Sequence, residues 1–105
     1  MGEVVYSPKA LADIERIHNY IRDALLNPPA AERIVTMIFD AGDSLAATPR
    51  PGAPFRSDLD LLKYYRYLTV ENYLLVFRVQ DGVARIVRVL HRLQDSISIL
   101  LNEPF

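Results

Sequence analysis

Apolar residues recur at steps of three and four between positions 8 and 25, the spacing that places them on one face of a helix. The apolar series consists of Leu11, Ile14, Ile17, Ile21 and Leu25, and the polar residues Lys9, Asp13, Glu15, Arg16, Asn19, Arg22 and Asp23 fill the other faces. Ser7 suits the N-cap of this helix, and Pro8 suits its first position, where no backbone N–H is needed. The pattern predicts an amphipathic helix from residue 8, preceded by a short strand at residues 3–6.

A second helix is predicted after Asn27-Pro28-Pro29. Proline excludes the helical conformation for the residue before it, so this tripeptide ends the first helix, and Asn27 or Pro28 can cap the next. The second apolar stripe consists of Ala31, Ile34, Val35, Ile38, Ala41 and Leu45, and Thr48-Pro49 ends it. Two helices joined by so few residues run antiparallel, which predicts a helical hairpin over residues 8–48.

Three β-prone runs follow an irregular loop that is rich in proline and glycine. The loop covers residues 49–60, the runs cover 62–69, 73–79 and 83–90, and turns are expected at 70–72 and at Asp81-Gly82. The middle run, YLLVFRV, is almost wholly apolar, which predicts a strand covered on both faces. In the third run Arg85 and Arg88 are three residues apart, so we expect them on opposite faces.

The chain ends with a short predicted helix, for which Asp95 or Ser96 can serve as the cap. This helix is expected to bury Ile97, Leu100 and Leu101. The element order is therefore β-αα-βββ-α, which defines an α+β fold with helices packed on a mainly antiparallel sheet. At 105 residues, half of them hydrophobic, the chain is expected to form one domain over residues 1–105.

Composition narrows the classes of function. The absence of cysteine excludes disulfides, thiolate zinc sites and cysteine nucleophiles, so the cytoplasm is the expected compartment. Neither a signal peptide nor a membrane-spanning run is expected. Residues 1–48 carry four basic and seven acidic residues, whereas 49–105 carry eight basic and six acidic. The second half could therefore face an anionic partner, although an excess of two charges also fits an ordinary solvated surface.

Familiar catalytic motifs are missing. His18 and His91 lie on different elements without the spacing of a metal site, so no metal is expected, and His18 fits the edge of a buried helix face. No GxSxG elbow is present, so a serine nucleophile is not expected. No GxGxxG or GxxxxGK[ST] loop is present to hold phosphates, so no nucleotide cofactor is expected through those loops. The acidic residues are interpreted as solvated helix faces and caps, and no pair of catalytic carboxylates stands out.

Arginine and tyrosine residues of the second half are the remaining candidates. The group consists of Arg66, Arg78, Arg85, Arg88 and Arg92, interleaved with Tyr64, Tyr65, Tyr67 and Tyr73. Such residues can bind phosphates and stack on bases, and they are also common at protein–protein hot spots. Alternatively, the rings pack in the core and the arginine stems lie over apolar surface.

Taken in order, four segments resemble the RelE/ParE superfamily of toxins from bacterial type II toxin–antitoxin modules, particularly the ParE (plasmid-stabilisation) branch. These segments are VVYSPKALADIERIHNYI, PPAAERIVTMIFDAGDSLAATPRPGAP, YRYLTVENYLLVFRV and VRVLHRLQDSISILL. The resemblance covers nearly the whole chain. It implies a helical hairpin packed on a curved antiparallel sheet and a cognate ParD-like antitoxin that wraps the toxin. It also implies that the chain contacts DNA only through that antitoxin, in an assembly that can be a heterotetramer.

The two branches of the superfamily imply different mechanisms. RelE toxins cleave messenger RNA on the ribosome with basic residues, one of which is an arginine where this chain has Leu74. They also carry an arginine and then a tyrosine near the C-terminus, a region that here contains no tyrosine. ParE toxins inhibit DNA gyrase by binding it and catalyse no reaction. Their VLH ending, followed by a polar segment and Asp, matches His91 and Asp95, although Gln94 replaces a common arginine.

The sequence therefore favours a non-enzymatic gyrase inhibitor with no catalytic residues and no cofactor. Its candidate target-binding residues are Arg66, Arg88, His91, Arg92 and Asp95. The first four are also the candidate catalytic set if the chain is a ribosome-dependent endonuclease. A third possibility is a degenerate toxin that acts only as a corepressor with its antitoxin. For His91 and Asp95 the alternative is structural: they close the last strand and cap the final helix.

Overall fold

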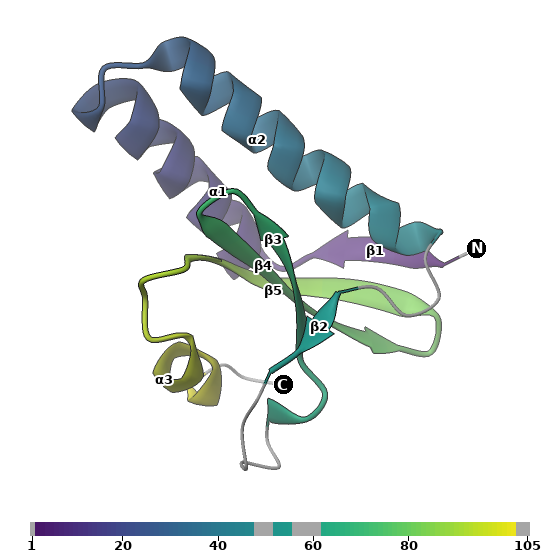
Figure 1. Ribbon diagram of the computed structural model, residues 1–105. Coiled ribbons are helices and arrows are strands. Elements are labelled where there is room, and N and C mark those ends of the chain that lie inside the picture. Colours follow the sequence, from purple (N-terminus) through teal and green to yellow (C-terminus); the bar gives the residue numbers. More distant parts are fainter. Residues whose placement is uncertain (1, 48–51, 56–61, 103–105) are drawn as a thin grey trace.

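A five-stranded mixed sheet forms the centre of the computed structural model, which describes residues 2–47, 52–55 and 62–102 (Figure 1). The strands are β1 (Glu3–Tyr6), β2 (Ala53–Pro54), β3 (Arg66–Val70), β4 (Tyr73–Gln80) and β5 (Val83–His91). Their order is β1-β5-β4-β3-β2; β1 runs parallel to β5, and the other neighbours are antiparallel. The helices are α1 (Pro8–Asn19), α2 (Pro28–Asp43) and α3 (Ser96–Leu101). The predicted α+β class is confirmed, and the predicted elements occur in the expected order, with one further short strand, β2, inserted after the helical hairpin.

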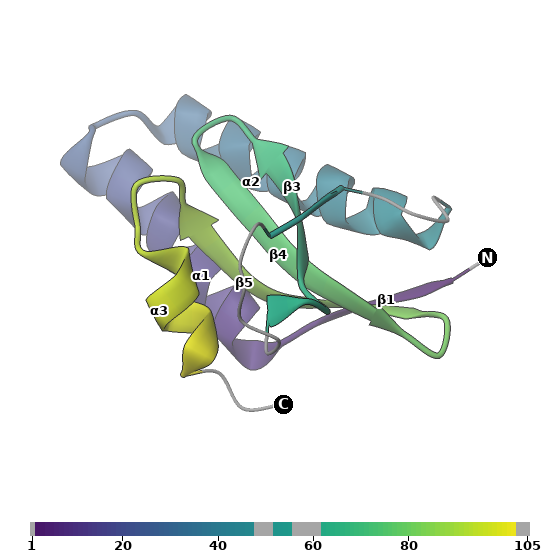
Figure 2. The ribbon, with the colours of Figure 1, turned by 60° about the horizontal axis from the view of Figure 1, so that its bottom comes forward.

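The two faces of the sheet are covered by different elements. The α1–α2 hairpin lies over one face, while α3 lies on the other side of the sheet (Figures 1 and 2). The hairpin core includes Ile14, Ile34, Ile38, Leu75, Phe77, Ile86 and Val89. The core on the second face consists of Leu62, Tyr65, Val76, Val87, Leu90 and Leu100. Consecutive β4 residues Leu75, Val76 and Phe77 are fully buried, which confirms that this strand is covered on both faces.

Helix starts follow the predicted capping residues. The hydroxyl of Ser7 accepts a hydrogen bond from the backbone N–H of Ala10 at 3.0 Å, and Pro8 begins α1. The side-chain oxygen of Asn27 accepts from the N–H of Ala30 at 3.2 Å, and Pro28 begins α2. Between the helices, residues Tyr20–Ala24 form one π-helical turn. Local capping chemistry therefore sets the length and the reversal of the helical hairpin.

Several predicted boundaries differ from the structure. The run predicted as a strand from residue 62 becomes extended only at Arg66; residues 62–65 form a turn that buries Leu62 and Tyr65 against the second face. The loop contains an unpredicted strand, β2, which pairs with β3. The predicted helix end at Thr48-Pro49 lies outside the described residues. Four residues expected in the helix cores are instead substantially exposed: Leu11, Leu25, Ile97 and Leu101.

A β-bulge changes the expected facing of two arginines. Arg85 pairs with Arg78, and Arg88 pairs with Val76, because the register shifts by one residue between Val76 and Phe77. Val87 is the extra residue of β5. Cross-strand partners point to the same side of an antiparallel pair, and Arg78 and Val76 are two apart on β4. Arg85 and Arg88 therefore share a face by register, and the expectation of opposite faces is wrong.

Along the described part of the chain, no helix combines the length and the apolar character that a bilayer crossing requires.

Gly42 lets α2 approach β1, which gives a test of this packing. A Cβ at Gly42 would overlap the hydroxyl of Tyr6, which donates to the Asp43 carboxylate at 3.0 Å. Alanine normally stabilises a helix relative to glycine by up to about 1 kcal/mol, but overpacking costs about 1–3 kcal/mol. We expect Gly42→Ala to lower the free energy of unfolding by about 1 kcal/mol in urea titrations.

The matched control is the same change in a Tyr6→Leu background, where the ring is gone. There Gly42→Ala should raise the free energy of unfolding relative to Tyr6→Leu alone, because only the helix preference remains. The same loss in both backgrounds would contradict this account of the contact.

Candidate functional site

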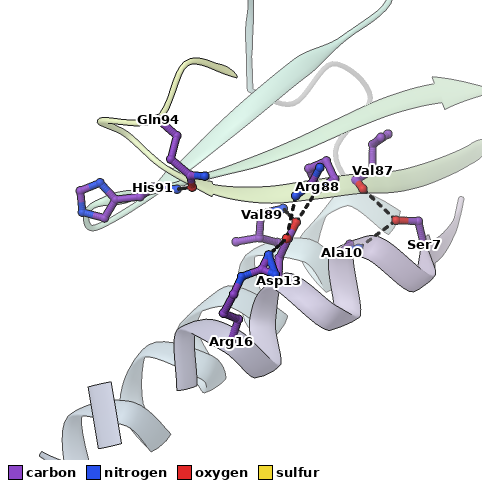
Figure 3. Close-up of polar contacts among 9 residues, drawn as sticks. All are labelled: Ser7, Ala10, Asp13, Arg16, Val87, Arg88, Val89, His91 and Gln94. Carbon is purple, nitrogen blue, oxygen red and sulfur yellow. Dashed lines mark hydrogen bonds and ion pairs between the residues drawn. The ribbon is translucent and has the colours of Figure 1, made fainter. Parts of the chain in front are cut away.

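Asp13 of α1 lies at the junction of the helical hairpin and β5 and is 2% exposed (Figure 3). Its Oδ2 accepts from Arg88 Nε at 2.7 Å and from the backbone N–H of Val89 at 3.0 Å. Its Oδ1 accepts from Arg88 Nη2 at 2.9 Å, and Arg16 Nη2 also donates to it. A buried carboxylate requires such partners, because an unpaired one would carry a large desolvation cost.

Ser7 also bonds to β5, nearer the N-terminus than Asp13. We call these contacts of Ser7 and Asp13 with β5 the Asp13 seam. The backbone N–H of Ser7 donates to the carbonyl of Ile86 at 2.9 Å. Its hydroxyl donates to the carbonyl of Val87 at 2.8 Å (Figure 3). The register of β1 on β5 ends at the pair of Tyr6 with Ile86. Beyond that point, the side chains of Ser7 and Asp13 bond to the backbone of β5 in place of a neighbouring strand. These contacts set the position of α1 against the sheet.

Sequence reasoning missed Asp13, because the helix pattern placed it among solvated polar residues. The structure corrects that interpretation, since Asp13 is buried and bonded to three residues. The available signal was the charged Arg88 inside the apolar run VARIVRVL, because a partly buried arginine needs a carboxylate partner. Among the candidates, Arg88 is therefore already held in an ion pair.

His91 ends β5 and contacts Tyr73, its register partner. The two rings meet edge to face, with centroids 5.4 Å apart. The pKa of Tyr73 is raised, mainly because its hydroxyl is partly buried. The Nδ1 of His91 accepts from the backbone N–H of Leu93 at 3.1 Å. Its own backbone N–H donates to Gln94 Oε1 at 2.8 Å. In Figure 3 the imidazole points away from Asp13.

Gln94, for which the resemblance to ParE toxins implied an arginine, stabilises the turn after β5 through its hydrogen bond from the His91 N–H. The same turn is tied to the β3–β4 turn, since the backbone N–H of Arg92 donates to the carbonyl of Asn72 at 2.8 Å. These bonds fix the backbone of the His91–Arg92 corner.

Asp95 caps α3, and it is one of the two residues predicted for this role. Its carboxylate accepts from the backbone N–H of Ser98 at 3.2 Å and from the Ser98 hydroxyl at 2.8 Å. These two hydrogen bonds, first that of the hydroxyl, lower the pKa of Asp95. This is the structural role expected for the residue as an alternative to target contact.

Arg66 lies on β3, away from the other candidates. It pairs with Phe77, and its Nη2 donates to the carbonyl of Gly52 at 2.9 Å. Phe77 and Tyr73 are four residues apart on β4, so Arg66 and His91 are separated by about 13 Å along the strand direction. Arg88 pairs with Val76 and lies by register on the opposite face from Arg66.

The structure therefore brings together the His91–Arg92 corner and the start of α3, whereas Arg66 and Arg88 are each held elsewhere. Among the described residues, no group of three His, Asp or Glu side chains is placed to hold a metal ion.

A family model described as the ParE toxin of the type II toxin–antitoxin system parDE matches residues 4–96. The toxin RelE2 of Caulobacter vibrioides is 35% identical over 91 residues, which cover 87% of this chain and 96% of that protein.

Two solved structures share the architecture. A chain of the chromosomal ParDE system from P. aeruginosa superposes with a TM-score of 0.71 at 26% identity, covering 87% of this chain and 96% of that one. A chain of the RelBE2 toxin–antitoxin complex from Mycobacterium tuberculosis superposes with a TM-score of 0.54 at 23% identity, covering 87% and 98%. The architecture is that of RelE/ParE-superfamily toxins. The chain belongs to the ParE toxin family of type II toxin–antitoxin systems.

The contacts of Asp13 predict that the free energy of unfolding depends strongly on this one carboxylate. We expect Asp13→Ala to lower the free energy of unfolding by about 3 kcal/mol, because it leaves Arg88 and the Val89 N–H without their acceptor. Urea unfolding monitored by circular dichroism measures the change.

The control is Asp23→Ala, which removes an exposed carboxylate bonded to neighbouring Arg22. Exposed pairs of this kind contribute about 0–1 kcal/mol, so this variant should stay close to the parent. Equal losses in the two variants would show that burial of Asp13 is not the cause.

Asp95 predicts a pH dependence that is local to α3. Its pKa is lowered in the folded chain, so its stabilisation of α3 is fully present above the unfolded value of about 3.9 and is lost as the pH falls through the folded pKa. We expect amide protection of α3 to decrease on acidification in this window, measured by NMR hydrogen exchange. Asp95→Asn, which keeps the cap without the charge, should remove that pH dependence; an unchanged acid response would contradict the assignment.

Proposed function

We propose that this toxin acts by binding DNA gyrase and blocking its supercoiling reaction, and that it catalyses no reaction of its own. The match to the ParE family model supports the proposal that gyrase is the target. The candidate target-binding surface is the His91–Arg92 corner with Asp95 and the start of α3. Arg66 and Arg88, the other two candidates, stabilise the surrounding fold.

The observation that carries the non-enzymatic assignment is the separation of the basic candidates. Cleavage of a phosphodiester requires a proton acceptor, a proton donor and a cation within hydrogen-bond reach of one phosphate. Here Arg88 is bonded to buried Asp13, and Arg66 lies by register on the other face, bonded to the Gly52 carbonyl. The Nδ1 of His91 accepts a backbone hydrogen bond. This distribution supports binding rather than bond cleavage.

Leu74 gives further support. This residue occupies the position of an arginine in the RelE resemblance, and its side chain packs against the core that also holds Leu100 of α3. An aliphatic side chain can neither transfer a proton nor neutralise a phosphate.

A cognate ParD-like antitoxin is the proposed inhibitor of this toxin. The solved structures include chains from a ParDE system and from a RelBE2 complex. Exposed apolar residues near the C-terminus, Leu93, Ile97 and Leu101, offer the contact area that such a partner would cover. Contact with operator DNA would pass through the antitoxin, and a heterotetramer is a possible stoichiometry. The cytoplasm, where gyrase and its DNA substrate are found, is the proposed location.

Ribosome-dependent cleavage of messenger RNA is the second candidate function, because the relative from Caulobacter vibrioides is named toxin RelE2. In that case Arg66, Arg88, His91 and Arg92 are the residues to substitute. A third candidate is a degenerate toxin that acts only as a corepressor, whose expression without antitoxin would leave growth unchanged.

The deciding experiment is a gyrase supercoiling assay on relaxed plasmid, run beside an in-vitro translation assay. We expect the purified toxin to block supercoiling and to leave translated transcripts uncut. His91→Ala/Arg92→Ala should inhibit about tenfold less, since truncating interface anchors typically costs 1 kcal/mol or more each.

Arg22→Ala is the matched control, because this exposed arginine of the π-helical turn bonds to neighbouring Asp23 and lies on a different element from the His91–Arg92 corner. It should inhibit like the parent. Normal supercoiling together with cut transcripts would refute the gyrase proposal in favour of the endonuclease; no effect in either assay would favour the corepressor.

A further inference from the structure

The turn between β3 and β4 lies against α2 and links that helix to the His91–Arg92 corner (Figures 1 and 2). On the α2 side, Arg33 Nη1 donates to Glu71 Oε1 at 2.6 Å. On the other side, the carbonyl of Asn72 accepts from the backbone N–H of Arg92 at 2.8 Å. Because Glu71 and Asn72 are consecutive, one two-residue turn carries both contacts.

Glu71 has a backbone conformation that suits glycine. Its φ is 51°, in the left-handed region, where a residue with a Cβ is strained and where glycine, asparagine and aspartate are the usual choices. The other hairpin turn follows that preference, since Asp81 and Gly82 form it with φ of 53° and 77°, as the sequence predicted. Residues that keep such strain cluster where function depends on the local geometry.

The stability of the fold does not account for this glutamate. The side chains of Arg33 and Glu71 are 55% and 40% exposed, and ion pairs this exposed contribute little to the free energy of unfolding. Glycine at position 71 would relieve the backbone strain at the cost of this weak pair. What the glutamate adds is a directional contact with α2. The guanidinium of Arg33 is itself oriented by Met37, whose sulfur lies 3.5 Å from Nη1.

Strand register carries the position of the turn to the corner. Tyr73 follows the turn and pairs with His91, and the two rings meet edge to face. Arg92, the next residue along, is bonded to the Asn72 carbonyl. A shift of the turn relative to α2 would therefore move both residues of the corner.

We propose that Arg33 and Glu71 are positioning residues, whose ion pair fixes the β3–β4 turn against α2 and so holds His91 and Arg92 in the geometry that binds the target. This inference rests on the proposed function of the His91–Arg92 corner, and it adds two residues that lie outside that candidate surface. A corner held in its binding geometry loses less conformational entropy when a partner docks. The ion pair thus acts on the affinity for the target and leaves the stability of the fold nearly unchanged.

The first test is the supercoiling assay, read as the toxin concentration that gives half-maximal inhibition. Glu71→Gly and Arg33→Gln should each inhibit about threefold less than the parent, the loss expected for an exposed ion pair. Arg33→Glu, which opposes two carboxylates, should lose at least as much, and the exchanged pair Arg33→Glu/Glu71→Arg should regain inhibition. Arg22→Gln, which breaks an exposed ion pair with Asp23 on another element, should inhibit like the parent.

Hydrogen exchange of the Arg92 amide, followed by NMR, is a readout that does not involve the target. In Glu71→Gly and Arg33→Gln this amide should exchange about threefold faster, because its acceptor turn is held less firmly. The Val89 amide, bonded to buried Asp13, and the urea midpoint should stay close to the parent. Equal acceleration of both amides, or a clearly lower midpoint, would show that the pair serves the fold and would overturn the proposal.

The two readouts separate this inference from the proposed function. Unchanged Arg92 exchange overturns the inference. Full inhibition by Glu71→Gly and Arg33→Gln, where His91→Ala/Arg92→Ala inhibits poorly, also overturns it while the gyrase target stands. If the parent leaves supercoiling unaffected, the gyrase target is wrong, and selectively faster Arg92 exchange in the two variants still supports the positioning of the corner.

Discussion

Beyond the point where β1 ends, the backbone N–H and C=O groups of β5 still need hydrogen-bond partners. This requirement shapes the junction between the helices and the sheet. Asp13 and Ser7 meet it with side-chain atoms that bond to the Val89 N–H and the Val87 carbonyl. The same carboxylate neutralises Arg88, so one buried group serves the strand edge and the arginine together. Because Asp13 lies on α1 and Ser7 is its N-cap, the position of α1 on the sheet is determined by polar contacts as well as by apolar packing.

Features that depend on neighbouring residues could be predicted from the sequence. Both helix caps, at Ser7 and Asn27, and the Asp81-Gly82 turn follow from chemistry within three or four residues. Burial of β4 on both faces followed from its almost wholly apolar run. Features that depend on distant partners were missed: the bulge at Val87 shifts the register, and β2 forms only because β3 lies beside it. The sequence pattern contains no local signal for either.

The candidate site shows the same difference between features set by neighbouring residues and features set by distant partners. Residue types indicated which basic side chains could contact a target, but their faces and partners depend on strand register. Arg88 is a candidate by sequence and an ion-pair partner by structure, because Asp13 lies 75 positions away along the chain. The side chain of Gln94 accepts a hydrogen bond from the His91 N–H, a contact that the sequence pattern did not indicate. The ParE family match makes the gyrase target the leading proposal, and the distribution of the basic groups argues for inhibition by contact.

The pairing of β1 with β5 has a consequence for biosynthesis. Residues 3–6 find their partners at 83–86, so the first strand to leave the ribosome has no place to dock until most of the chain has been translated. Asp13 likewise waits for Arg88. Contacts of such wide sequence separation slow folding and leave the helical hairpin exposed on the nascent chain.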